Sequence, residues 1–313
     1  MRIIFFGSSE FSVPPFELCL ASPHQVVAAV TTPDRPKGRG LQVQPNPLKE
    51  RSEKAGILTL PFASLKNPDA QKQAAYLNPD IFVVASYGKL IPDAWLRIPK
   101  KLALNIHPSL LPKHRGAAPI TWQILEGDKE TGVSIAEVTP ALDAGDIFHQ
   151  MREPLREKET TATLTRHLSQ LSVKALEIVL NQIEKGSVNR APQKGPSSYA
   201  KKLTKEDGRL DLSEPAEILD RKIRAFDPWP GAFIGFQGEP LRLIEAIPGP
   251  ASTDREAPGT LLEISSDGFL RIQTGQGSLK IFKVQKSGRQ VISGQEFANG
   301  QRLKPGFIFE KLL

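Results

Sequence analysis

The chain has 313 residues and a formal net charge of +7, and its 39% of hydrophobic and 24% of charged residues are typical of a soluble globular protein with about two domains. No apolar run approaches the roughly 18 residues of a membrane-spanning helix, and the run after Met1 is too short for a signal peptide, so we expect a cytoplasmic protein with no membrane contact. The single cysteine excludes an internal disulfide, and the histidines show no metal-ligand spacing with it, so no bound metal is expected.

The N-terminal part alternates strand and helix patterns. Residues 2–7 predict a buried strand, residues 12–21 a helix, and residues 26–31 a second strand. This order favours a parallel, doubly wound α/β sheet of the Rossmann-like kind. Gly7-Ser8-Ser9-Glu10 does not match the Gly-x-Gly-x-x-Gly fingerprint, which argues against a nicotinamide-dependent dehydrogenase.

A segment rich in proline, glycine and basic residues follows at 33–45. Its prolines and glycines predict a loop without regular structure, and Arg35, Lys37 and Arg39 gather positive charge within it. Loops of this length in a compact domain are usually functional or disordered. The residues alone leave both readings open, a mobile solvated loop or a binding segment.

Two polar side chains stand at the end of a predicted strand. Helices are predicted at 48–55 and 66–76 and a strand at 80–88, and the apolar residues 102–104 then lead to Asn105 and His107. Residues two apart in an extended segment point to the same face, and Pro108 disfavours helix at His107. The amide and the imidazole should therefore face one crevice at the strand end.

Asp143 completes this polar set. Residues 109–119 predict a loop, residues 120–126 a helix, and residues 133–138 a strand that delivers Asp143 to the same sheet edge. Asn105 could donate to an oxyanion, a contact worth roughly 2.7–4 kcal/mol in a transition state. His107 could move a proton and Asp143 could orient it, so the set suits acyl transfer to an amine. Taken singly, the three could be a structural histidine and two turn residues.

The second half of the chain has a different pattern. Residues 163–184 predict a long amphipathic helix that closes the first domain, and residues 185–205 are basic and contain no acidic residue. After a helix at 215–226, five short strand candidates suggest a small barrel, at 232–236, 241–246, 260–264, 269–273 and 279–284. The expected organisation is a first domain at 1–189, a basic linker at 190–205 and a barrel domain at 206–313.

The motif Asn-Ile-His-Pro-Ser-Leu-Leu-Pro at 105–112, followed by Leu-Asp-Ala-Gly at 142–145, resembles the signature of the folate-dependent formyltransferases. The resemblance implies transfer of a formyl group from 10-formyltetrahydrofolate. It implies that the catalytic set is Asn105, His107 and Asp143. It also implies that the folate is bound by the loop Ser109, Leu110, Leu111 and Pro112 and by the pocket wall at Tyr87, Gly88 and Ile91.

Further motifs resemble the branch of that family that acts on methionyl-tRNA. These are Pro-Asp-Arg-Pro-Lys-Gly-Arg-Gly at 33–40, Arg-Gly-Ala-Ala-Pro at 115–119 and the Pro-Trp-Pro-Gly-Ala turn at 228–232. The resemblance implies an initiator methionyl-tRNA as partner, an OB-like C-terminal domain and a monomer. The residues expected to contact the tRNA are Arg35, Lys37, Arg39, Lys201 and Lys202.

Two other functions remain open at the level of sequence. The same catalytic set serves formylation of a sugar-nucleotide or another small amine. Such acceptors need neither the 33–45 loop nor the basic C-terminal segment 278–313, which has 7 Lys and Arg against 2 Asp and Glu. The second alternative is an RNA-binding protein whose transferase site is inactive. The intact set Asn105, His107 and Asp143 argues against that alternative.

Overall fold

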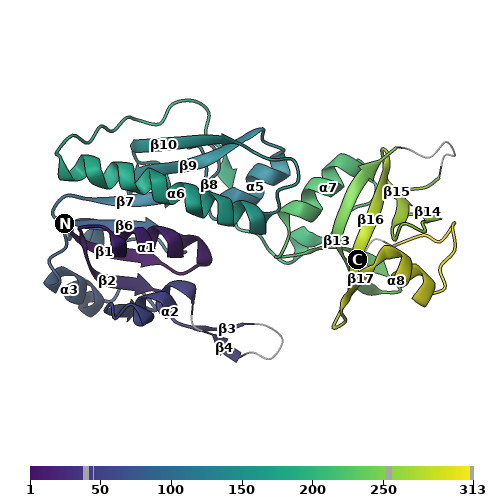
Figure 1. Cartoon of the computed structure of the whole chain (residues 1–313), viewed down its shortest axis with the longest axis horizontal. Helices are drawn as coiled ribbons and strands as arrows, with labels where there is room; N and C mark the ends of the chain where they lie inside the picture. Colours follow the sequence, from purple (N-terminus) through teal and green to yellow (C-terminus); the bar gives the residue numbers. More distant parts are fainter. Residues whose placement is uncertain (38–41, 45, 251–255, 311–313) are drawn as a thin grey trace. The chain divides into compact units, whose positions relative to one another are not determined.

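The structure is a computed structural model that describes residues 1–37, 42–44, 46–250 and 256–310. It contains two compact units. Figure 1 draws the whole chain with colours that follow the sequence. The first unit comprises residues 1–120, 129–155 and 164–201, and the second comprises residues 121–128, 156–163 and 202–313. The division falls within helices α5 (Pro119–Glu126) and α6 (Thr161–Glu184).

The first unit is built on a seven-stranded sheet in the order β10-β9-β7-β6-β1-β2-β5. The five strands from β7 to β5 are parallel, which confirms the predicted α/β class. At the β7 edge, β9 runs antiparallel to β7, and the outermost strand β10 runs antiparallel to β9. The central strands read as continuous apolar runs because both of their faces are buried. The strands are β1 (Arg2–Gly7), β2 (Gln25–Thr31), β5 (Thr59–Pro61), β6 (Ile81–Ala85), β7 (Leu102–His107), β9 (Glu130–Glu137) and β10 (Ile147–Pro154).

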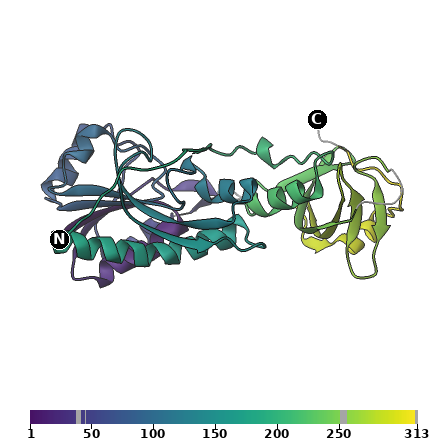
Figure 2. The same cartoon turned by 90° about the horizontal axis from the view of Figure 1, so that it is seen from above.

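Helices cover both faces of this sheet, as Figure 2 shows. On one face lie α1 and α6, and the Ser169 hydroxyl of α6 donates a hydrogen bond to the Phe11 carbonyl. On the other face, Trp95 of α4 and Ala74 of α3 pack into the core around Phe6. The remaining bounds are η1 (Glu10–Ser12), α1 (Val13–Ala21), α2 (Pro47–Lys54), α3 (Pro68–Tyr76) and α4 (Asp93–Leu96).

Asn-Pro pairs begin two of these helices. The side chain of Asn46 accepts from the Lys49 amide at the start of α2, and that of Asn67 accepts from the Asp69 amide at the start of α3. Each asparagine satisfies an amide that the first turn leaves unpaired, and the proline that follows needs no donor there.

The segment 33–45 departs from the predicted loop without regular structure. Strands β3 (Arg35–Lys37) and β4 (Gln42–Gln44) form a short antiparallel sheet in which Pro36 pairs with Val43. The prediction that proline excludes a strand here was wrong, because a two-stranded sheet consists only of edges and a proline is tolerated where its nitrogen faces outward. Arg39 lies outside the described residues.

Residues 190–201 belong to the first unit and pair with two of its other segments. Ala191 and Ile147 exchange two backbone hydrogen bonds, of 2.8 and 2.9 Å. Further along, β11 (Tyr199–Ala200) pairs in parallel with β8 (Arg115–Gly116). Most of the segment that the sequence suggested as a linker is thus attached to the loops at the end of the first unit's sheet.

The second unit is an antiparallel sheet in the order β12-β13-β16-β15-β14, with β17 (Val291–Ser293) beside β16. Near the C-terminus, Glu310 bridges to Gly235 in β12 and Ile308 bridges to Thr260 beside β14, so one segment joins the two outer strands and closes a small barrel. This confirms the predicted barrel. The other elements are η2 (Glu206–Gly208), α7 (Ala216–Ala225), β12 (Ala232–Phe236), β13 (Glu239–Gly249), β14 (Leu261–Ile264), β15 (Leu270–Gln273), β16 (Ser278–Lys286) and α8 (Gly294–Gly300). No described helix has both the length and the apolar character needed to cross a membrane.

Candidate active site

Strand β7 places Asn105 and His107 together, as their spacing predicts. The strand lies between β6 and β9, with Asn105 opposite Ala136 and His107 opposite Ser134. Asn105 is half-buried, whereas the His107 side chain is almost completely buried. The two side chains therefore share one end of the sheet, and the imidazole is largely shielded from water.

Asp143 lies in the turn between β9 and β10 and closes the set. Its Oδ1 accepts a hydrogen bond of 2.9 Å from Asn105 Nδ2, and its Oδ2 accepts one of 2.8 Å from the Gly116 amide. Its Oδ1 also lies 3.7 Å from His107 Nδ1. Asp143 has a φ of +51°, a left-handed conformation that aspartate tolerates better than most residues. The structure thus brings the three predicted residues together.

A backbone contact sets the tautomer of His107. Its Nε2 lies 2.9 Å from the His114 carbonyl oxygen, and since a carbonyl only accepts, Nε2 carries the proton and donates. In the neutral ring the free lone pair is then on Nδ1, on the side of Asp143. A proton gained by the imidazole would bind at Nδ1 and face the carboxylate.

The environment lowers the pKa of His107 from its ordinary value of 6.5. Burial is the largest cause, because a charged ring loses its hydration there, and nearby His114 and Arg115 act in the same direction. Asp143 and the hydrogen bond to His114 oppose this but do not outweigh it. The imidazole is therefore neutral at pH 7 and available as a base.

The Ser-Leu-Leu-Pro loop is held by buried hydrogen bonds. Ser109 and Leu111 are buried, and the Ser109 hydroxyl donates to the Lys113 carbonyl. Ser134 Oγ donates to the Ser109 carbonyl at 2.6 Å and accepts from the Leu111 amide, and Gln150 Nε2 donates to the Leu111 carbonyl. Leu110 and Pro112 are half-buried. The Ser109 hydroxyl therefore stabilises the loop through a hydrogen bond within it.

The three residues expected to form a pocket wall follow strand β6. Tyr87 and Ile91 are buried in the hydrophobic core, where the Tyr87 ring packs edge-on against Phe6 with 5.5 Å between centroids. Burial raises the pKa of the Tyr87 hydroxyl. Gly88 has a φ of +78°, which turns the chain back at the end of the strand. Leu90, between Gly88 and Ile91, is 69% exposed.

The basic residues expected to contact RNA lie in separate segments. Arg35 and Lys37 begin and end β3, whereas Arg39 falls outside the described residues. Lys201 and Lys202 are exposed and adjacent, where the chain passes from the first unit to the second.

The structure adds three groups that the sequence did not single out as part of the site. The Gly116 amide binds Asp143, the His114 carbonyl binds His107, and the Gln193 side chain binds the backbone of the Asp143 turn. Two of these three groups, the Gly116 amide and the His114 carbonyl, are backbone atoms, so residue types carry no signal of them. Gly116 in a loop was the one visible sign, because a glycine often marks close approach of backbones.

Gly116 should not tolerate a side chain. Its φ is +117°, and an added Cβ would lie 2.7 Å from the Ala200 carbonyl oxygen and 2.9 Å from Tyr199 Cε2. We expect Gly116→Ala to lower the free energy of unfolding by about 1–3 kcal/mol and kcat at least about tenfold, since the amide that holds Asp143 must move. Urea unfolding and initial rates would measure both quantities.

Gly186→Ala is the matched control for that variant. Gly186 has a φ of +67°, but an added Cβ meets no described atom within 4 Å. This variant therefore carries the backbone strain without the collision, and it should keep kcat. A Gly116→Ala enzyme with the kcat of wild type would contradict the role of the Gly116 amide.

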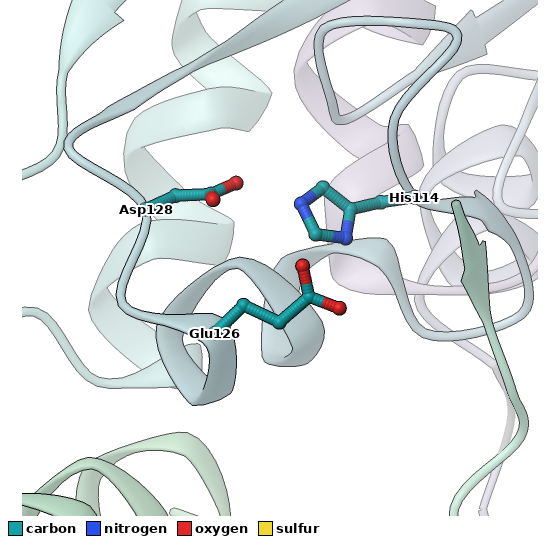
Figure 3. A group of neighbouring side chains, drawn as sticks. All are labelled: His114, Glu126 and Asp128. Carbon is teal, nitrogen blue, oxygen red and sulfur yellow. The ribbon is translucent and has the colours of Figure 1, made fainter. Parts of the chain in front are cut away.

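His114, Glu126 and Asp128 offer side chains of metal-binding type (Figure 3). His114 belongs to the first unit, whereas Glu126 and Asp128 belong to the second. Because the two units are described separately, no metal site is assigned to these three side chains.

Two family models match the chain. The model for "Formyl transferase" covers residues 1–180, and the model for "Formyl transferase, C-terminal domain" covers residues 202–302. Among related proteins, the methionyl-tRNA formyltransferase of Hydrogenovibrio crunogenus is 40% identical over 304 residues, which are 97% of this chain and 97% of the relative.

Solved structures share the fold at lower identity. HypX from Aquifex aeolicus in complex with tetrahydrofolic acid is 22% identical with a TM-score of 0.63 over 95% of this chain, which spans about half of HypX (47%). WlaRD, a sugar 3N-formyl transferase with dTDP and 5-N-formyl-THF, is 17% identical with a TM-score of 0.66 over 93% of this chain and 99% of WlaRD. The N-formyltransferase from Helicobacter canadensis with folinic acid and dTDP-3-aminofucose is 16% identical with a TM-score of 0.67, over 90% of this chain and 98% of that protein.

Proposed function

The chain belongs to the formyl transferase family, and from this premise we propose that it transfers the formyl group of 10-formyltetrahydrofolate to the α-amino group of methionyl initiator tRNA. The observation that carries the proposal is the convergence of Asn105, His107 and Asp143 at one end of the sheet. The chain that holds them is 40% identical, over 97% of its length, to a methionyl-tRNA formyltransferase.

In the proposed reaction the methionyl amine attacks the formyl carbon directly. A carbon–nitrogen bond forms, and the carbonyl oxygen becomes an oxyanion. Asn105 Nδ2 has two hydrogens, and it donates one of them to Asp143 Oδ1. The second hydrogen can be donated to the oxyanion. A positioned donor of this kind is worth roughly 2.7–4 kcal/mol in the transition state.

His107 moves the proton in the same reaction. Nδ1 of the neutral ring accepts the proton that the attacking amine loses, and it returns that proton to N10 as the bond from the formyl carbon to N10 breaks. The products are formylated methionyl-tRNA and tetrahydrofolate, so atoms and charge balance. Asp143 Oδ1, at 3.7 Å from Nδ1, stabilises the imidazolium between the two transfers.

The remaining proposed roles concern binding. Leu110, Pro112 and the backbone of Ser109 and Leu111 contact the folate, with Tyr87, Gly88 and Ile91 behind the pterin. Arg35, Lys37, Arg39, Lys201 and Lys202 contact tRNA phosphates, whose charge such residues neutralise. Catalysis is proposed for residues 1–189 and tRNA binding for 206–313, in a cytoplasmic monomer.

The other functions receive less support. The sugar N-formyltransferases resemble this chain at 16–17% identity, which shows a common fold and carries no argument about the acceptor. An RNA-binding protein with an inactive site would have no need to keep Asp143 bound to both Asn105 and the Gly116 amide.

Initial formylation rates with 10-formyltetrahydrofolate test the proposal. We expect rapid formylation of methionyl-initiator tRNA, and kcat/KM lower by orders of magnitude for free methionine, because phosphate contacts supply most of the binding. Methionyl-elongator tRNA offers the same phosphate backbone, so its lower kcat/KM would report recognition of tRNA features other than phosphate. Equal rates with free methionine would contradict a tRNA substrate. Activity with none of these acceptors would contradict the proposed function.

A further inference from the structure

Residues 191–200, here called the strap, run across the loops that surround His107. The strap is attached at one end by the two backbone hydrogen bonds between Ala191 and Ile147. At the other end its strand β11 pairs with β8, and the Ala117 amide donates to the Ala200 carbonyl at 2.9 Å. All of these contacts lie within the first unit.

Gln193 is the side chain by which the strap reaches the Asp143 turn. Its Nε2 donates to the carbonyl oxygens of Asp143 and Gly145, both at 2.8 Å. Its Oε1 accepts from Arg115 Nη2 at 2.7 Å and from Arg115 Nε at 3.1 Å. One amide thus uses both of its donors on the Asp143 turn and its acceptor on the segment next to Gly116.

Ser198 makes the corresponding contact on the other side of His107. Its Oγ accepts from the His114 amide at 2.9 Å, and its carbonyl accepts from the Arg115 amide at 3.0 Å. The His114 carbonyl in turn accepts from His107 Nε2. The strap therefore holds both neighbours of the imidazole, the carboxylate beside Nδ1 and the carbonyl beside Nε2.

We propose that Gln193 is a positioning residue for the transfer reaction, which fixes the Asp143 turn so that the carboxylate faces His107 Nδ1, and that Ser198 does the same for the His114 carbonyl. The inference rests on the proposed function for its kinetic part. Asp143 occupies a left-handed φ in a short turn, where the Gln193 amide is the side chain that binds its carbonyl. Without the two donors of Gln193, the carbonyls of Asp143 and Gly145 accept hydrogen bonds from water instead. The turn then shifts, and the Asp143 carboxylate moves away from His107 Nδ1.

A purely structural role for Gln193 predicts different behaviour. If Gln193 only attached the strap, its loss would lower the melting temperature and leave kcat per folded enzyme unchanged. Positioning predicts that kcat falls while KM for both substrates stays within about threefold, because a displacement of about 1 Å at a catalytic group costs up to about 100-fold in rate. The titration of His107 separates the two roles further.

The kinetic experiment compares Gln193→Ala, Gln193→Glu and Ser198→Ala with Ser197→Ala as the matched control. Ser197 is the exposed neighbour of Ser198 on the strap. We expect kcat to fall about 10- to 100-fold in the first two variants, and less in the third, with wild-type kcat in the control. Glutamate keeps an acceptor for Arg115 but has no donor for the two carbonyls, so full activity of Gln193→Glu would overturn the proposal.

A second readout needs no substrate. The ring nitrogens of His107 are titrated by ¹⁵N NMR in wild type, Gln193→Ala and Ser197→Ala. The charged or titratable groups that act on this ring are Asp143, which raises its pKa, and His114 and Arg115, which lower it. If Asp143 moves away from the ring in Gln193→Ala, the pKa of His107 should fall further in that variant. It should stay at the wild-type value in Ser197→Ala.

The two readouts separate the inference from the function on which it rests. An inactive wild-type enzyme would contradict the proposed function, while the titration would still decide whether Gln193 positions Asp143. An unchanged His107 titration in a folded Gln193→Ala protein would overturn the positioning role, whatever the acceptor proves to be.

Discussion

Replacement of His107 by asparagine is expected to lower kcat by about 10²- to 10⁴-fold, the usual contribution of a positioned proton-transfer group. Asparagine is similar in size and polar, but it has no nitrogen that takes up a proton at neutral pH. The attacking amine would then have to lose its proton to water, and N10 would leave without a proton donor. Initial rates with saturating donor and methionyl-tRNA would measure the change.

Substrate binding should survive the same substitution. His107 is almost completely buried and its Nε2 is bound to the His114 carbonyl, so the ring contributes little surface to either substrate. We therefore expect the Kd for tRNA and the KM for the donor to stay within about threefold of wild type. A His107→Asn enzyme that turns over at near the wild-type rate would refute the assignment of the base.

The pH dependence of the wild-type rate follows from the lowered pKa of His107. The ring must be neutral to accept the amine proton, so kcat is kept above its pKa and lost as the pH falls through it. Since burial lowers that pKa from 6.5, the midpoint of the acid limb should lie below 6.5. A kcat profile measured from about pH 5 to 8 would show this, and a midpoint above the ordinary histidine value would contradict it.

Asp143→Asn is expected to have the second large effect, a loss in kcat of about 10²- to 10⁴-fold, as for other imidazoles that lose an orienting carboxylate. Asparagine tolerates the left-handed φ of this position, so the turn should remain. Its single oxygen accepts from Asn105 Nδ2 or from the Gly116 amide, but its amide nitrogen must then face the other donor. The imidazolium also loses the negative charge beside Nδ1.

Two measurements check this variant. The pKa of His107, followed by ¹⁵N NMR, should fall in Asp143→Asn because the attraction that raises it is gone. Asp146→Asn removes the same charge from a position three residues further along the turn, and its kcat should stay within about threefold of wild type. Equal losses in both variants would mean that a general change in charge, and not the Asp143 contacts, causes the effect.

Local pattern in the sequence predicted the main elements of the first unit and the candidate catalytic residues, but not the β3–β4 sheet. The buried apolar runs of β1 and β6 and the βαβ order predicted the parallel sheet, because such runs occur where both faces of a strand are covered. The two-residue spacing and the proline after His107 placed Asn105 and His107 on one face of β7. These features depend on neighbours within a few residues, which is the range over which periodicity carries information.

The contacts that arrange the site could be found only in the tertiary structure. Asn105 and Asp143 are 38 residues apart, Gln193 and Asp143 are 50 apart, and His114 and Ser198 are 84 apart. The sequence predicts a basic linker at 190–205, and within it Gln193 and Ser198 lie against the loops around His107. Hydrogen bonds from side chains to distant backbone atoms form only where the fold brings two loops into contact. The residue types of the two partners do not show which loops will be in contact. The sequence by itself therefore determined the candidate groups for the chemistry, and the tertiary structure decided what holds them in place.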